Sequence, residues 1–169
     1  MAAAPLVSVV LPTRDRQASL ARSVGSVLGQ TLDDLELIVV DDVSTDGTAE
    51  LLDAIVDPRL VRVRLEGRNG PARARNAGLR VARGPLVAFQ DSDDAWAPTK
   101  LAEQVARLEA AGPGVGGVGG AYRVEVTGAP VTIRSVALEE GGDYERDLLE
   151  GPCCITPVWT IRRSLVEQL

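Results

Sequence analysis

Acidic side chains are concentrated at Asp91-Ser92-Asp93-Asp94, one residue after the apolar run Leu86 to Phe89. Carboxylates this close together repel one another unless a positive charge joins them. Mg²⁺ or Mn²⁺ suits that role, because these cations prefer oxygen ligands, and Mg²⁺ is commonly held by one or two carboxylates together with substrate phosphates. The alternative is a solvated turn that caps a helix opening at Pro98. The position after a buried strand favours the metal.

A second acidic pair, Asp41-Asp42, follows the apolar run Leu35 to Val40. A carboxylate at this position could accept a hydrogen bond from a base N–H or from a ribose hydroxyl. It could equally cap the next helix or a turn, although Asp46 and Thr48 are also available for capping. The spacing leaves both interpretations open.

Arginines gather at Arg68, Arg73, Arg75 and Arg80. The planar guanidinium group can bind two phosphate oxygens at once, so this segment could contact a phosphate. An ordinary exposed basic helix face is the alternative. Arg68 and Arg75 are seven residues apart, as are Arg73 and Arg80, so each pair would share a face of any helix that covers both members.

Composition excludes several other functions. The chain has no histidine, which removes His-based triads and imidazole bases. Cys153 and Cys154 are adjacent, so no disulfide framework is expected, and a nucleophilic role is disfavoured without a histidine partner. The net charge of −6 argues against a nucleic-acid partner. No signal peptide is expected, and no apolar run reaches the roughly 18–20 residues of a membrane span. We expect a cytoplasmic protein that could still contact a membrane surface.

The elements that must position these residues follow from periodicity. Apolar runs predict strands at 7–11, ended by Pro12, and at 35–40, 60–65 and 86–89, the third half-exposed. Apolar stripes predict helices at 20–28, 51–55, 71–81 and from Pro98 onward. Alternating strands and helices predict a Rossmann-like α/β fold, with a mostly parallel sheet between helices. Ligands of such sheets bind at the carboxyl ends of the strands, so residues 13–15, 41–42 and 91–94 should share one edge.

The chain changes character after Gly112. Residues 114–120 are glycine-rich, and valine-rich segments follow around Val124 and Val131, with a turn expected at Gly128. A short helix is predicted at 143–150, a strand at 159–162, and a helix from Ser164 that the end of the chain cuts short. We therefore expect one domain over 1–169, in which residues 1–111 form an α/β portion and residues 112–169 an α+β tail.

Four segments in order resemble family 2 glycosyltransferases of the GT-A fold. They are Val7–Thr13 (VSVVLPT), Val40–Thr48 (VDDVSTDGT), Ala74–Gly78 (ARNAG) and Phe89–Asp94 (FQDSDD). Each is weak alone, but together they span about residues 6 to 100. The resemblance implies inverting transfer of a sugar from a nucleotide diphosphate donor, with UDP-sugar favoured, to an unidentified sugar, lipid or other acceptor. Residues 1–111 would bind the nucleotide sugar, and residues 112–169 would be an incomplete acceptor side.

The resemblance also implies roles for particular residues. Those expected to contact the nucleotide sugar are Pro12, Thr13, Arg14, Asp41, Arg75, Asp91 and Ser92. Asp41 would bind the base, Arg75 would lie near the diphosphate, and Asp91 would approach the ribose. Asp93, with Asp91, would bind Mg²⁺ or Mn²⁺.

The sequence departs from the family pattern at informative positions. Val43 stands where glycine is common, which should strain its turn, and Arg14 could stack on the base in place of an aromatic ring. The downstream Glu-Asp pair whose aspartate serves as the base is absent, so the catalytic base is unknown. The late acids that could replace it are Asp143, Glu145, Asp147 and Glu150.

Without that base we expect donor binding but inefficient transfer, unless a partner chain or a homodimer mate supplies it. Two alternative functions remain. One is a non-catalytic or truncated nucleotide-sugar-binding domain. The other is a nucleotidyltransferase, which would need a glycine-rich basic loop after the first strand, whereas Thr13 to Arg16 contains no glycine.

Overall fold

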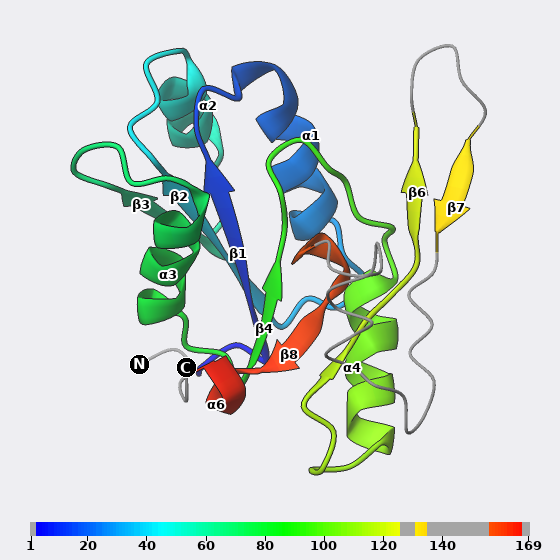
Figure 1. Cartoon of the computed structure of the whole chain (residues 1–169). Helices are drawn as coiled ribbons and strands as arrows, with labels where there is room; N and C mark the ends of the chain where they lie inside the picture. The colour runs from blue at the N-terminus through cyan, green and yellow to red at the C-terminus, as the bar shows by residue number, and fades with distance from the viewer. Residues whose placement is uncertain (1–2, 126–130, 135–155, 167–169) are drawn as a thin grey trace.

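The computed structural model describes residues 3–125, 131–134 and 156–166. A six-stranded sheet has the order β3-β2-β1-β4-β8-β5, and β6 pairs with β7 in a separate hairpin (Figure 1). The strands of the main sheet are β1 Val7–Thr13, β2 Leu35–Asp41, β3 Leu60–Arg64, β4 Leu86–Phe89, β5 Gly117–Val118 and β8 Thr160–Arg162. The hairpin strands are β6 Tyr122–Val124 and β7 Thr132–Arg134. The helices are α1 Gln17–Leu28, α2 Thr48–Ala54, α3 Pro71–Val81, α4 Lys100–Ala110 and α6 Arg163–Val166, with a 3-10 turn, η1, at Thr156–Val158.

The predicted mostly parallel α/β sheet is confirmed. Strands β3, β2, β1 and β4 are parallel, whereas β8 runs antiparallel to both β4 and β5. All seven residues of β1 and all seven of β2 are buried, as expected for parallel strands covered on both faces.

Helices cover both faces of this sheet. On one face Val9 joins a core that includes Leu20 of α1 and Leu101 of α4. On the other face Val10 packs with Ala74 of α3. The approach of α3 is close, because a Cβ built on Gly78 would lie 2.4 Å from a methyl carbon of Val10. The glycine of the ARNAG segment therefore lets α3 rest directly on β1.

The prediction that Pro12 ends the first strand is wrong, since β1 continues to Thr13. Proline has no backbone N–H group, so it disrupts a sheet where that donor is needed. The carbonyl of Val10 accepts a bond from Gln90 of the β4 side, so Pro12, two residues on, faces the same side. There β4 has already ended, and its register with β1 stops at Val10. Toward β2, Thr13 still accepts a bond from Asp42.

Other boundaries agree closely with the sequence prediction. Helix α3 covers the predicted range 71–81, and β3 shows the predicted half-exposed alternation. Helix α4 begins at Lys100 instead of Pro98, and α6 begins at Arg163 instead of Ser164. The apolar stripe of α1 is buried at Leu20, Val24 and Val27, as predicted.

The tail contributes to the main sheet. The strand predicted at 159–162 is β8, which adds to the edge of β4, and β5 pairs with it. The valine-rich segments form β6 and β7, and this pair extends away from the main sheet, above α4 in the view of Figure 1. The turn predicted at Gly128 and the helix predicted at 143–150 lie outside the described residues. The division of the chain at residue 112 stays a prediction.

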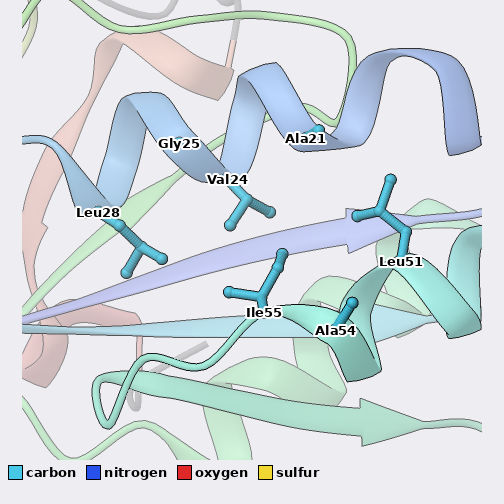
Figure 2. Close-up of a pocket in the computed structure, with 7 residues that line it drawn as sticks. All are labelled: Ala21, Val24, Gly25, Leu28, Leu51, Ala54 and Ile55. Carbon is cyan, nitrogen blue, oxygen red and sulfur yellow. The ribbon is translucent and has the colours of Figure 1, made fainter.

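Two further features concern surfaces. None of the helices within the described ranges has the length and apolar character that crossing a bilayer requires. An apolar pocket lies between α1 and α2 (Figure 2), lined by Ala21, Val24, Gly25, Leu28, Leu51, Ala54 and Ile55. It lacks the polar groups that a nucleotide or a metal would require.

Candidate functional site

The carboxyl ends of three neighbouring strands meet at one edge of the sheet. The register places Thr13 of β1 opposite Asp41 of β2, and Asp41 opposite Arg64 of β3. The main chain of Asp41 and the following residue continues these contacts, because Asp42 donates to Thr13 and Leu65 donates to Asp41. The predicted convergence of residues 13–15 and 41–42 at this edge is therefore observed.

Asp41 uses only one of its two carboxylate oxygens for hydrogen bonds within the protein. Oδ1 accepts hydrogen bonds from the backbone N–H of Ser44, at 2.9 Å, and from the Ser44 hydroxyl. Oδ2 is buried without a hydrogen-bond partner, and the nearest cation is Arg64, whose Nε lies 3.8 Å away. The Thr13 hydroxyl is also buried and unpartnered. Since buried polar atoms are normally satisfied, this corner is suited to an additional hydrogen-bonding group.

The loops after β1 and β2 are joined in a strained arrangement. Val43 has φ +60° and Asp15 has φ +49°, conformations in which a β-branched valine is a genuine outlier. Asp15 donates its N–H to the Ser44 hydroxyl, and its Oδ1 accepts the N–H of Thr45 at 2.7 Å. That backbone bond, opposed by desolvation and aided by Arg14, lowers the pKa of Asp15. Backbone strain of this kind persists where surrounding contacts determine it.

The acidic turn after β4 is held by polar groups of α1. The hydroxyl of Ser23 donates to the carbonyl of Asp91, and that of Ser19 donates to the carbonyl of Ser92, both at 2.9 Å. Arg22 donates to the carbonyl of Asp93. These three residues of α1 were not singled out from the sequence, although their i, i+3, i+4 spacing places them on one helix face.

Each predicted metal ligand has a basic partner. Asp91 Oδ1 lies 2.7 Å from Arg75 Nη2, and Asp93 Oδ2 lies 3.3 Å from Arg16 Nη2. Partial desolvation, with the negative charges of Asp93 and Asp91 adding to it, raises the pKa of Asp94. The carboxylates of the turn thus repel one another, and a divalent cation would reduce that repulsion.

The donor set fits a cation that shares its ligands with phosphate. Within the described ranges, no group of three or more acidic, cysteine or histidine side chains is placed to hold a metal ion. A Mg²⁺ or Mn²⁺ ion here would therefore need oxygen atoms from a bound phosphate beside Asp91 and Asp93, which is the usual mode for Mg²⁺.

The arginine cluster divides into two kinds of residue. Arg75 is partly buried on α3 and paired with Asp91, and its Nε is buried without a partner. Arg73 and Arg80 are exposed, which agrees with the solvated-face interpretation for them. Arg68 precedes α3, so it does not share a helix face with Arg75. Arg64, which no sequence pattern singled out, lies beside Asp41 instead.

This sheet, with its acidic strand ends, defines an α/β domain of the GT-A glycosyltransferase class. It superposes with a TM-score of 0.72 on a mannosyltransferase from Pyrobaculum calidifontis, solved in complex with GDP-Man and Mn²⁺. The two are 28% identical, and the match covers 98% of this chain and 47% of that one. The chain belongs to glycosyl transferase family 2, whose family model matches residues 8–169.

Two curated relatives match about three fifths of the chain. The teichuronic acid biosynthesis glycosyltransferase TuaG of Bacillus subtilis, whose name marks it as putative, is 45% identical over 103 residues, 60% of this chain and 41% of that protein. The UDP-Glc:alpha-D-GlcNAc-diphosphoundecaprenol beta-1,3-glucosyltransferase WfaP of Escherichia coli is 36% identical over 104 residues, 62% of this chain and 41% of that protein. The chain thus matches about two fifths of the length of these relatives.

Proposed function

We propose that this chain binds a nucleotide diphosphate sugar at the carboxyl edge of its sheet and forms the donor-binding portion of a metal-assisted glycosyltransferase. The observation that carries the proposal is the buried, unpartnered Oδ2 of Asp41 beside the unpartnered hydroxyl of Thr13. A ligand with an N–H group at this corner would satisfy an acceptor that the protein leaves unused.

The base is proposed to be uracil. Its N3–H is a single donor that matches the carboxylate oxygen of Asp41 that lacks a hydrogen-bond partner. Arg64, 3.8 Å from that oxygen, would donate to a base carbonyl. WfaP is named for a UDP-Glc donor, which supports this choice, whereas the mannosyltransferase was solved with GDP-Man. Guanine also presents N–H donors, so the test below compares the two directly.

The diphosphate is proposed to lie between Arg75 and the acidic turn. When a divalent cation is bound there, it offsets the negative charge of the departing nucleotide diphosphate. Asp93 and Asp91 would hold the cation, and Arg16 and Arg75, which now pair with them, would be free to contact phosphate oxygens. Ser19 and Ser23 keep the backbone of the turn in place.

The catalytic base stays unassigned. The late acids Asp143, Glu145, Asp147 and Glu150 lie outside the described residues. The acceptor is proposed to be a sugar or sugar-lipid, because WfaP is named for a sugar linked to diphosphoundecaprenol.

A thermal-shift panel tests the proposal. UDP, GDP, ADP and CDP are each added with Mn²⁺ or with EDTA, and UDP with Mn²⁺ is expected to stabilise the chain most. A ligand at 100 times its Kd adds about 2.7 kcal/mol to the free energy of unfolding. The absence of stabilisation by every nucleotide would contradict donor binding, and a larger effect of GDP would replace the uracil assignment.

A further inference from the structure

Asp42 differs from its neighbour Asp41 because both of its carboxylate oxygens are already used. Oδ1 accepts the backbone N–H of Asn69 and Oδ2 accepts that of Gly70, each at 2.7 Å. The side chain is buried, with a relative exposure of 4%. Both oxygens of Asp42 are therefore engaged by the loop before α3, although sequence spacing presents Asp42 as the equal of Asp41.

The electrostatics favour the ionised form of this carboxylate. Burial alone would raise the pKa of Asp42, but the N–H groups of Asn69 and Gly70 and the charge of Arg14 outweigh it and lower the pKa. A carboxylate that accepts two backbone N–H groups is held strongly, because hydrogen bonds to a charged group are the strong ones.

The clamped segment leads directly into α3. Gly70 is the residue before the helix and has φ +82°, and its carbonyl accepts the N–H of Ala74 in the first turn. Asn69 also donates through its side chain to the carbonyls of Glu66 and Gly67, which closes the loop on itself. Asp42 is thus the side chain that fixes this loop, and with it the start of α3, to the end of β2.

Helix α3 then transmits that position to the other side of the site. Arg75 lies in the second turn of α3 and is paired with Asp91 beyond β4. A rigid helix only 11 residues long moves as one body, so a shift at Gly70 would displace the Arg75 guanidinium. The ends of β2 and β4 are therefore connected through Asp42, Gly70, Arg75 and Asp91.

We infer that Asp42 is a positioning residue that acts on the diphosphate of the donor through α3 and Arg75, while Asp41 contacts the base directly. This inference rests on the proposed function. Asp41 would then contact the base directly. Asp42 would act on the diphosphate indirectly, through the backbone of a loop 27 residues away.

Isothermal titration with uridine and with UDP plus Mn²⁺ separates these roles. The variant Asp42→Asn can accept only one of the two N–H groups, because its amide nitrogen is a donor. It should bind UDP about ten-fold more weakly, the equivalent of losing one hydrogen bond to a charged group. Its affinity for uridine should change by less than about two-fold, a change below the strength of one such bond. Asp41→Asn should weaken both ligands by the same factor, and Asp53→Asn, on the exposed face of α2, should weaken neither.

A second variant keeps the test independent of folding at residue 42. Gly70→Ala should strain the same clamp from the loop side, because Gly70 has a positive φ that alanine adopts poorly. The Cβ position lies in open space, so the added methyl group itself makes no clash. This variant should also weaken UDP and spare uridine. Amide hydrogen exchange in the unliganded chain should show protected N–H groups at Asn69 and Gly70 that lose protection in Asp42→Asn.

The possible failures are distinguishable. Equal losses for uridine and UDP in Asp42→Asn, or unchanged UDP binding, would overturn the positioning role and leave the proposed function standing. A parent chain that binds neither uridine nor UDP would overturn the proposed function, and the positioning role with it.

Discussion

Arg75 of α3 and Asp91 beyond β4 form an ion pair of 2.7 Å between Nη2 and Oδ1 that joins two elements 16 residues apart in the sequence. Arg75 is 24% exposed and Asp91 34% exposed, so water screens the pair only in part. The contact closes the side of the site opposite to Asp41.

Removal of this ion pair should cost stability. We expect Arg75→Met to lower the free energy of unfolding by about 1 kcal/mol, a value reduced for partial exposure. Urea unfolding at pH 7 measures it. Arg80→Met, on the exposed face of the same helix, is the matched control and should change stability by less than about 0.5 kcal/mol. Equal effects of the two substitutions would show that the pair contributes nothing specific.

Asp93 should carry the metal dependence of nucleotide binding. We expect Asp93→Asn to remove most of the extra thermal stabilisation that UDP gains from Mn²⁺ over EDTA, because an amide is a poorer ligand for a hard cation. Glu109→Gln, an exposed acid near the end of α4, should retain it. A full Mn²⁺ effect in Asp93→Asn would rule out the ligand role.

Asp41 should account for base recognition. Replacement of Asp41 by alanine should weaken UDP binding by about 1.5–3 kcal/mol, the range for a hydrogen bond to a charged group. Isothermal titration gives the difference directly. The substitution also removes the cap on Ser44, so circular dichroism should first confirm that the variant is folded. Affinity equal to that of the parent would leave Asp41 with only its structural role.

Val43 should be replaceable by glycine with a gain in stability. A non-glycine residue at φ +60° destabilises the folded chain by roughly 1–2 kcal/mol. Glycine removes that strain, but its greater freedom in the unfolded chain lowers the free energy of unfolding by about 0.5–1 kcal/mol. We therefore expect Val43→Gly to raise the free energy of unfolding by about 0.5–1 kcal/mol, measured by urea unfolding. Val56→Gly is the control, since Val56 is 97% exposed and does not have positive φ, and it should lower stability. A loss in both variants would mean that the strain at Val43 is small.

Glu36 should make stability depend on pH. Burial would raise the pKa of Glu36, but the hydroxyl of Ser8 and the backbone and guanidinium of Arg83 lower it below the usual 4.5. A lowered folded-state pKa gives stabilisation that is present above the unfolded value and is lost as pH falls through the folded one. Glu36→Gln should therefore be less stable by about 1–3 kcal/mol at pH 7.

That deficit should shrink as the pH falls from 4.5 through the lower folded-state pKa, because the unfolded chain takes up a proton first and the folded chain follows. Urea unfolding at pH 7 and at about pH 3.5 would show it. A deficit of the same size at both values would attribute the loss to packing instead of charge.

Hydrophobic periodicity and the residues at strand ends were enough to predict several helices and the acidic residues of the candidate site. The apolar stripe at Leu20, Val24 and Val27 identified α1, and Pro71 marked the start of α3, because both signals are local. The acids at the ends of β2 and β4 were found for the same reason. The outcome at Pro12 depended instead on which neighbouring strand its missing N–H would face, and that is a property of the assembled sheet.

The features that sequence reasoning missed are contacts between distant segments. Asp41 and Asp42 are neighbours with the same side chain, yet only the fold shows that Asn69 and Gly70 occupy both oxygens of the second. Ser23 likewise gains its role from a carbonyl 68 residues away. Single residues of ordinary type in ordinary helix positions carry no local signal of such partners.

The proline at the end of β1 has a consequence for how the chain avoids a competing structure. The next bond of a parallel ladder between β1 and β4 would run from the N–H of residue 12 to the carbonyl of Gln90. Pro12 has no such donor, so the segment after Phe89 gains nothing by extending as a strand, and it leaves the sheet at Gln90. An alanine at position 12 would supply that bond and favour a longer β4, in which Asp91 and Ser92 become strand residues instead of a turn held by α1. Pro12 thus favours the short β4, and it keeps the acidic turn from being drawn into the sheet.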